Sequence, residues 1–397
     1  MNSLRDQMPA LHNKTYFNYG GQGPLPQDSL AAITSSWEKI QELGPFTNSI
    51  WPYIASENNF TKQELTKACG ASIKRIALTE NVTSGCVLPL WGLPFNTGDR
   101  ILISDCEHPG VVAACIEIAK RKGLEIDILN IQNVHINLSN KVDVKDTIFV
   151  ILEKALQKKT RLVVISHVLW NTGAIMPVEA ISLRLSNHPN KPFLLVDGAQ
   201  SFGQLPIQKD VNSSDIYAFT GHKWACGPEG LGGVVLSERV LNEARPTLVG
   251  WKSLKNENIL DTDNINLFHQ DSRKFEIATS CIPLLAGLRC SLNLLDLEGN
   301  IEQRFKTIQG YSEELWSKLS LLNHVDMILQ KPPSSGLISF KIQSTLSPKE
   351  IVSKLGNESI WIRALESPDC LRACVHITTT KEEINRLIYE LESLLNK

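Results

Sequence analysis

The sequence predicts an α/β protein, with a large domain built on a mostly parallel mixed sheet flanked by helices and a smaller α+β domain at the C-terminal end. Between residues 73 and 224, short apolar runs alternate with helical patterns, which is typical of a parallel sheet. From Asn300 onward the chain becomes charged and amphipathic, with short strand-like runs between helices. We therefore expect a large domain over 21–295, a small domain over 296–397, and an N-terminal segment, 1–20, that packs near the small domain.

Apolar runs of four to seven residues, such as RLVVIS, predict the strands, and longer runs with a helical period predict the helices. Two polar segments, at 130–147 and before about residue 270, are expected to be surface connections. The expected strands are 73–78, 99–105, 125–129, 161–166, 193–196, 216–219, 232–236, 336–342 and 361–364. The expected helices are 28–43, 60–69, 87–93, 111–122, 147–158, 178–186, 282–297, 301–321, 347–355 and 381–395.

The composition is that of an ordinary globular protein, with 42% apolar and 21% charged residues and a formal net charge of −2. This balance gives no support for a nucleic-acid or membrane partner. The N-terminal stretch lacks the apolar core of a signal peptide, and no run approaches the roughly 20 apolar residues that span a bilayer. A cytoplasmic protein with reduced cysteines is expected. The nine cysteines form no CxxC pair, and no metal site is expected.

Polar side chains follow two successive expected strands, 193–196 and 216–219. Asp197 and Gln200 follow the first strand, and Thr220, His222 and Lys223 follow the second. Ligands of open α/β sheets bind at the carboxyl ends of the strands. A lysine for a Schiff base, an acid for a pyridinium nitrogen and short polar groups for a phosphate together suit pyridoxal 5′-phosphate.

Four further stretches carry candidate residues with two interpretations each. Residues 79–86, which contain Val82 and Thr83, suit either an anion site or an ordinary helix cap. His108 is either a helix-capping histidine or an imidazole at a cofactor. Asn171 is either a turn residue or a ligand-binding amide. The Gly20–Gly21 loop is either a tight turn or a close approach to a ligand.

Two arginines of the small domain lie in apolar runs. Arg363 ends IWIR, and Arg372 lies in CLRACVHI. They are either surface arginines or, because an arginine in an apolar run needs an anionic partner, ligands of a carboxylate.

Taken together, these residues resemble the class V, fold-type I pyridoxal-phosphate enzymes. The pattern is a strand that ends in Asp-x-x-Gln, followed about 26 residues later by Ser/Thr-x-His-Lys, and it stands here as DGAQ and TGHK. The resemblance covers nearly the whole chain. Within this class the chain is most similar to the cyanobacterial L-cysteine/L-cystine C–S lyases, through the segments YFNYGGQG, CEHPG, LWNTG, VDGAQS, FTGHKW, VGW and DCLRAC.

The resemblance implies a role for each residue around the cofactor ring. Lys223 forms the Schiff base and moves the proton of the substrate Cα. Asp197 keeps the pyridine nitrogen protonated, so that the ring accepts negative charge. Gln200 contacts the phenolic oxygen of the ring, and His108 stacks on its face.

The resemblance also implies how the phosphate is held. The phosphate contacts from the cofactor's own subunit are Thr83, the backbone of Val82, Thr220 and His222. Thr279 matches a threonine that reaches the phosphate of the partner subunit, so a homodimer is expected.

For the substrate, the resemblance implies that Asn171 and Arg372 bind the carboxylate and that Arg363 is a second contact. Trp251 and the Gly20–Gly21 loop shape the pocket.

Two sulfur reactions share these early steps. A desulfurase needs a mobile nucleophilic cysteine on a loop before the substrate-binding arginine. Here only residues 365–371 lie between Ala364 and Arg372, so the acceptor loop is expected to be missing and Cys370 to be packed. We expect a C–S lyase acting on L-cystine or L-cysteine. The alternatives are a cysteine desulfurase that uses Cys370, with an iron–sulfur assembly protein as a possible acceptor, and a non-catalytic pyridoxal-phosphate-binding scaffold.

Overall fold

The large domain is organised around a seven-stranded sheet with the order β2-β8-β7-β6-β5-β3-β4. The computed structural model describes residues 3–134, 144–255 and 267–395. The strands of the sheet are β2 (Ile76–Thr79), β3 (Arg100–Ser104), β4 (Glu125–Leu129), β5 (Thr160–Ser166), β6 (Phe193–Asp197), β7 (Ile216–Thr220) and β8 (Gly232–Leu236).

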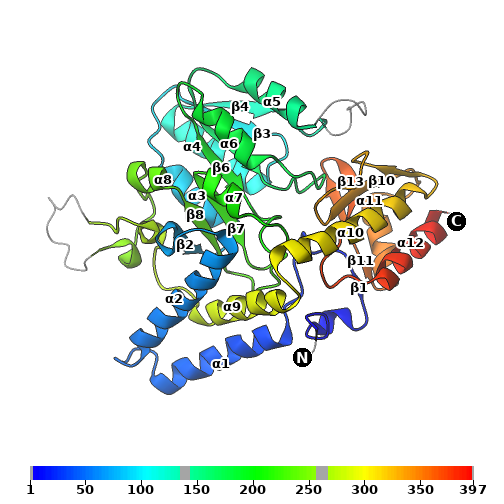
Figure 1. Ribbon diagram of the computed structural model, residues 1–397, viewed down its shortest axis with the longest axis horizontal. Coiled ribbons are helices and arrows are strands. Elements are labelled where there is room, and N and C mark those ends of the chain that lie inside the picture. Colours follow the sequence, from blue (N-terminus) through cyan, green and yellow to red (C-terminus); the bar gives the residue numbers. More distant parts are fainter. Residues whose placement is uncertain (1–2, 135–143, 256–266, 396–397) are drawn as a thin grey trace.

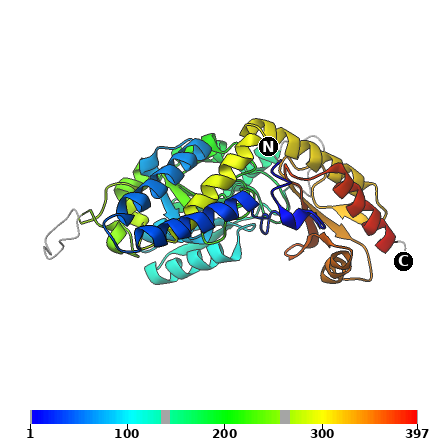
Figure 2. The ribbon, with the colours of Figure 1, turned by 90° about the horizontal axis from the view of Figure 1, so that it is seen from below.

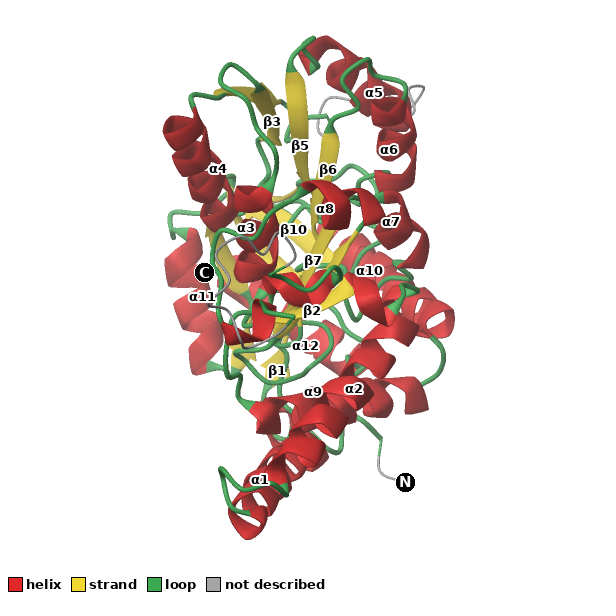
Figure 3. Ribbon diagram, turned by 90° about the vertical axis from the view of Figure 1, so that its left-hand side faces the viewer, coloured by secondary structure: helices red, strands yellow, loops and turns green. Residues whose placement is uncertain are grey.

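Strands β3 to β7 run parallel to one another, and β8 runs antiparallel to both of its neighbours, β7 and β2. This confirms the predicted mostly parallel mixed sheet. Apart from the edge strand β4, the apolar runs are buried on both faces, as expected for parallel strands between helices. Figure 3 shows α4 on one side of strands β3, β5 and β6, and α5 and α6 on the other.

The described part of the large domain has nine α-helices, of which α1 lies against α9 at the edge of the domain (Figure 1). Helix α2 is ten residues longer than the predicted helix 60–69. Its first half was not predicted, although Ile50 is buried there and Tyr53 and Ile54 pack against the core. An ion pair of Glu57 with Arg289 of α9, at 3.0 Å, also holds this half of the helix. The helices are α1 (Gln27–Leu43), α2 (Ile50–Cys69), α3 (Val82–Gly92), α4 (Pro109–Lys122), α5 (Val144–Ala155), α6 (Val178–Ser186), α7 (Gln208–Ser213), α8 (Glu238–Glu243) and α9 (Ile282–Leu297).

The small domain contains an antiparallel sheet with the order β12-β13-β10-β9. Its core joins apolar residues of this sheet to those of three helices, and it lies beside the large domain (Figures 1 and 2). The elements are α10 (Ile301–Ser320), β9 (Val325–Met327), β10 (Leu337–Ile342), α11 (Pro348–Asn357), β11 (Ile360–Trp361), β12 (Arg363–Glu366), β13 (Asp369–Cys374) and α12 (Lys381–Leu395).

The prediction of a single strand over 361–364 is wrong. The chain divides at Ile362 into β11 and β12, because the two halves pair with different partners. Strand β12 pairs with β13, and β11 pairs in parallel with β1 (Thr15–Tyr16).

The N-terminal segment lies against the small domain. Besides the pairing of β1 with β11, the guanidinium of Arg5 forms a 2.9 Å ion pair with Glu383 of α12. The chain then passes to α1 in the large domain. These contacts support the proposed division into residues 1–20, 21–295 and 296–397.

In the part of the chain that the structure describes, no helix is both long and apolar enough to cross a bilayer. The two polar surface connections expected from the sequence fall largely outside the described residues. The first is described only up to residue 134 and from α5 onward, and the second excludes 256–266.

Candidate active site

A cavity of about 420 Å³ lies at the carboxyl ends of the central parallel strands. It is bounded by the first turn of α3, the start of α4, the Gly20–Gly21 loop and the β12–β13 hairpin. Most of the predicted site residues line this cavity, although they come from both domains. Those that do are Gly20, Val82, Thr83, His108, Asp197, Gln200, His222, Lys223, Arg363 and Arg372.

Asp197 and Lys223 face this cavity from the ends of β6 and β7, which are parallel neighbours. Asp197 is buried, and its Oδ1 accepts a 2.8 Å hydrogen bond from the amide of Ala199. Burial raises the pKa of this carboxyl. Burial also lowers the pKa of Lys223 to about 8, an effect that Arg372 and Arg363 strengthen and Asp197 opposes. A lysine with such a pKa is partly neutral near pH 7, so it can act as a nucleophile.

The first turn of α3 supplies backbone donors at one end of the cavity. The side chain of Asn81 caps the helix by accepting a 2.9 Å hydrogen bond from the amide of Ser84. The helix therefore begins at Val82, five residues before the predicted start, and Val82 and Thr83 lie in its first turn. Free amides and the helix dipole favour an anion there.

His222 lines the same cavity, and its Nδ1 lies 2.8 Å from the hydroxyl of Thr220. Thr220 itself is fully buried and does not line the cavity. Burial lowers the pKa of His222, with a further contribution from the charge of Lys223. Thr220 therefore orients the imidazole.

His108 caps a helix and also lies on the wall of the cavity. Its Nδ1 accepts a 3.2 Å hydrogen bond from the amide of Gly110 and so caps α4, and the same ring lines the cavity. Burial and the charge of Lys223 lower its pKa. The imidazole is therefore neutral at pH 7, with the proton on Nε2 because Nδ1 is the acceptor.

The Gly20–Gly21 loop is a close approach of backbone to the cavity. A Cβ at Gly20 would lie 2.9 Å from Nη2 of Arg372 and 3.0 Å from the sulfur of Cys374, so a larger residue would require the Arg372 guanidinium to move. The carbonyl oxygen of Gly20 accepts a 2.9 Å hydrogen bond from Nε2 of Gln200, whose Oε1 accepts one from Trp224. Gln200 thus has one amide hydrogen left for a ligand.

Three orphaned polar groups mark the substrate side of the cavity. Arg372 is only 2% exposed, and Nη1 donates a 2.8 Å hydrogen bond to the carbonyl oxygen of Trp170, but Nε has no partner. Oδ1 of Asn171 and Nε1 of Trp170 are also buried without a partner. Asn171 does not line the cavity, and its amide group donates weakly to the carbonyl oxygen of Ser367, at 3.4 Å. Buried polar groups without partners point to a ligand that supplies them.

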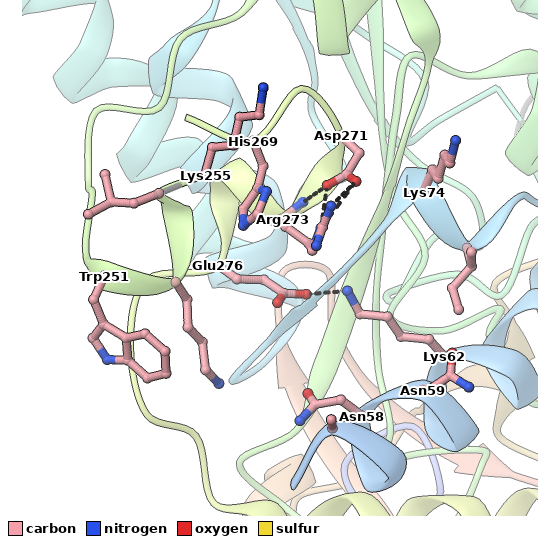
Figure 4. A pocket seen from close by; sticks show the side chains of 14 residues that line it. Asn58, Asn59, Lys62, Lys74, Trp251, Lys255, His269, Asp271, Arg273 and Glu276 are labelled. Carbon is pink, nitrogen blue, oxygen red and sulfur yellow. Dashed lines mark hydrogen bonds and ion pairs between the residues drawn. The ribbon is translucent and has the colours of Figure 1, made fainter. Parts of the chain in front are cut away.

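Besides Thr220 and Asn171, two further predicted site residues, Trp251 and Thr279, do not line this cavity. Trp251 is 46% exposed and borders a second cavity of about 670 Å³. Figure 4 shows it there, across from the 2.6 Å ion pair of Lys62 with Glu276. Thr279 is exposed, three residues beyond Glu276. Their roles stay predictions, for Trp251 in shaping the pocket and for Thr279 at the phosphate of the partner subunit.

Several residues of the site were missed in the sequence. Ser166 ends β5 and lines the cavity, as do Asn81 and Trp170. Ser166 is a polar residue at the carboxyl end of a predicted strand, as Asp197 is, so the sequence did contain the signal for it. Glu107 is buried beside His108 and gave no signal, because an acidic residue in a polar loop is usually exposed.

These residues fit pyridoxal phosphate. Asp197 would hold the ring nitrogen and Lys223 the aldehyde carbon, while the first turn of α3 and His222 would hold the phosphate. The unpaired Oδ1 of Asn171, an acceptor, and Nε of Arg372, a donor, would remain available to a further ligand. The sheet and this set of residues define the fold-type I class of pyridoxal-phosphate enzymes.

Residues 52–387 match the aminotransferase class-V family, and the chain belongs to it. Two solved structures are similar throughout. One is the cystine C–S lyase C-DES in complex with its reaction product cysteine persulfide, with 40% identity, a TM-score of 0.90, and coverage of 97% of this chain and 99% of that one. The other is a C-DES mutant, K223A, with glycine covalently linked to the PLP cofactor, with 39% identity, a TM-score of 0.91 and coverage of 98% of both chains.

A more distant relative is a probable cysteine desulfurase of Methanothermobacter thermautotrophicus, strain Delta H. It is 24% identical over 98% of this chain and 97% of its own length. The family thus contains both of the sulfur reactions that the sequence suggested.

Proposed function

We propose that this chain is a pyridoxal-phosphate-dependent C–S lyase that converts L-cystine and water to pyruvate, ammonia and cysteine persulfide. The observation that carries the choice between the sulfur reactions is the β12–β13 hairpin. Its strands pair from Arg363 with Arg372 to Glu366 with Asp369, so only Ser367 and Pro368 form the turn. This hairpin leaves no room for an acceptor loop.

Cys370 is a poor sulfur acceptor. It is 1% exposed, it packs with Ile328, Leu365 and Trp170, and burial raises the pKa of its thiol to about 12. A thiol of this kind is neither ionised nor mobile near pH 7. Of the nine cysteines, only Cys281 is exposed, and it does not line the cavity.

When bound, pyridoxal phosphate supplies an electron sink for negative charge at the substrate Cα. Arg372 binds the substrate carboxylate through Nε, which lacks a partner, and Arg363 adds positive charge. Asn171 donates to the same carboxylate through its amide nitrogen, because its unpaired Oδ1 is an acceptor. This places Cα near Lys223, whose low pKa suits it to accept and return a proton. The electrons left at Cα after loss of its proton expel the β-sulfur group. Transfer of that sulfur to the protein does not compete, because no acceptor thiol is present to attack it.

Cystine is the better substrate on chemical grounds, since a persulfide is a more acidic leaving group than a thiol. The similarity to C-DES, a cystine C–S lyase whose product is cysteine persulfide, supports this substrate. L-cysteine, which would release sulfide, is the second substrate.

The exposure of Thr279 and Trp251 supports a homodimer in which each subunit completes the cavity of the other, with Thr279 at the partner's phosphate. A role of the released sulfur in iron–sulfur assembly and a cytoplasmic location remain parts of the proposal.

One assay separates the three functions. The purified protein is incubated with pyridoxal phosphate and L-cystine or L-cysteine, and pyruvate and alanine are measured. Pyruvate supports the lyase, alanine supports the desulfurase, and neither product supports the scaffold.

A further inference from the structure

Glu107 is a buried carboxylate that the roles above do not use. Glu107 is only 6% exposed. It accepts three hydrogen bonds, one from the hydroxyl of Ser104, one from the amide of Ser166 at 2.7 Å, and one from the hydroxyl of Ser166 at 2.8 Å. All three donor atoms lie at the carboxyl ends of β3 and β5, next to the cavity.

No ion pair joins Glu107 to a cation in the described part of the chain, which is unusual for a buried acid. The ionisable groups that face it from the packed elements are one carboxyl and three thiols. Burial raises the pKa of Glu107 to about 7, and the charge of Asp197 adds to this effect. The groups are Asp197 of β6, Cys86 of α3, Cys115 of α4 and Cys106 of its own loop. The carboxyl is thus held by hydrogen bonds alone.

These hydrogen bonds connect three parts of the active site. Glu107 immediately precedes His108, so holding its side chain fixes the loop that carries this imidazole. Ser166 lines the cavity, and in the sheet it is the register partner of Asp197. A change at Glu107 therefore acts on the cavity through His108 and Ser166, and through the field at Asp197.

We propose that Glu107 is a positioning residue of the cofactor cavity, which fastens the His108 loop to the ends of β3 and β5 beside Asp197. This inference rests on the pyridoxal-phosphate site of the proposed function, but not on the reaction. It is therefore tested by cofactor binding in the absence of any amino acid.

Two substitutions separate the hydrogen bonds from the charge. In Glu107→Gln, the amide oxygen can accept from Ser104 and from the amide of Ser166, while the amide nitrogen donates to the Ser166 hydroxyl. In Glu107→Ala, all three are lost and a buried amide is left without a partner. A matched control is Glu57→Ala, which removes a buried glutamate paired with Arg289 far from the cavity.

The apo forms are titrated with pyridoxal phosphate, and protein fluorescence and the visible circular dichroism of the bound cofactor are recorded. We expect Glu107→Ala to raise the Kd by about tenfold or more and to change the dichroism band, because the supporting contacts of the site are lost. We expect Glu107→Gln to keep the Kd within about threefold of the wild-type value and to keep the wild-type dichroism band. Glu57→Ala lowers the melting temperature but leaves both unchanged.

A wild-type Kd and dichroism band in Glu107→Ala would overturn the inference, and so would an equal loss in Glu57→Ala. If Glu107→Ala does not fold, Ser104→Ala decides, because Ser104 does not line the cavity. A Kd raised by about threefold supports the role, and an unchanged Kd refutes it. Normal cofactor binding without turnover of cystine would instead contradict the proposed function and leave this inference standing.

Discussion

Arg372 donates a 2.8 Å hydrogen bond from Nη1 to the carbonyl oxygen of Trp170, which joins the small domain to the large domain at the substrate side of the cavity. Nε of the same guanidinium has no partner. A single lysine ammonium cannot keep the first contact and also present a planar pair of donors to a carboxylate.

We therefore expect Arg372→Lys to raise the KM for L-cystine by about 100-fold, with a smaller loss in kcat. Steady-state pyruvate formation gives both constants. Arg386→Lys, an exposed arginine of α12, is the control and should leave KM unchanged. An unchanged KM in Arg372→Lys would remove the carboxylate role from this residue.

The pKa of Lys223, lowered to about 8, sets the pH dependence of cofactor capture. Only the neutral amine attacks the aldehyde, so in the apo protein the rate should rise with pH through a midpoint near 8 and then level off. Stopped-flow absorbance after mixing with pyridoxal phosphate measures this rate.

Two substitutions should move this midpoint in opposite directions. Arg372→Ala removes a charge that lowers the pKa of Lys223, so the midpoint rises, and Asp197→Asn removes one that raises it, so the midpoint falls. Shifts in the same direction would show that these charges do not control the amine.

The buried thiol of Cys370 leads to a prediction about sulfur. Cys370→Ala should keep more than about half of the pyruvate formation and lose about 1–2 kcal/mol of unfolding free energy, because it only opens a small cavity. Cys281→Ala should keep full activity and full stability. Pyruvate assays and chemical denaturation test both variants. Loss of turnover in either variant would favour the cysteine desulfurase over the lyase.

Subunit mixing tests whether Thr279 acts on the partner. Thr279→Ala and Lys223→Ala subunits are each impaired, but a hybrid dimer contains one cavity with both wild-type residues if Thr279 acts across the interface. Reassorted subunits should then recover about a quarter of the wild-type activity at limiting cofactor. No recovery above the Thr279→Ala protein alone would place the threonine at its own subunit's phosphate, or at none.

Glu107 also has a consequence for stability against pH. Its pKa is raised in the folded state, so between its ordinary value and about 7 the folded protein holds a proton that the unfolded chain has released. The unfolding free energy therefore falls as pH rises through this window. Glu107→Gln should remove that fall and be more stable than the wild type at pH 8, by about 3 kcal/mol at most, but not at pH 5. Urea unfolding at the two pH values measures the difference, and equal stability changes would contradict it.

The sequence was enough to predict the parallel sheet and the Asp197–Lys223 pair, because both residues end buried runs that are neighbours in chain order. It was not enough for the boundary between β11 and β12, since the partner of β11 lies near the other end of the chain. The start of α3 was missed because Val82 and Thr83 have low helix propensity, and the cap by Asn81 decides the boundary.

The burial of Glu107 could not be predicted, because no apolar pattern in the sequence indicates it. Its place is set by three hydrogen bonds from two strands, and the sequence cannot show these contacts. Thr279 is a different case, because its predicted contact belongs to a second copy of the chain.

The pairing of β1 with β11 brings the first and last parts of the chain together, and the Gly20–Gly21 loop that follows β1 closes the cavity against Arg372. During synthesis on the ribosome, the large domain can emerge and fold before β11 and Arg372 have been made, so the small-domain side of the cavity is still missing. Because Arg363 and Arg372 come from the small domain, we expect substrate binding to wait until the C-terminal end of the chain has been released, whereas the residues that would hold the cofactor are already in place.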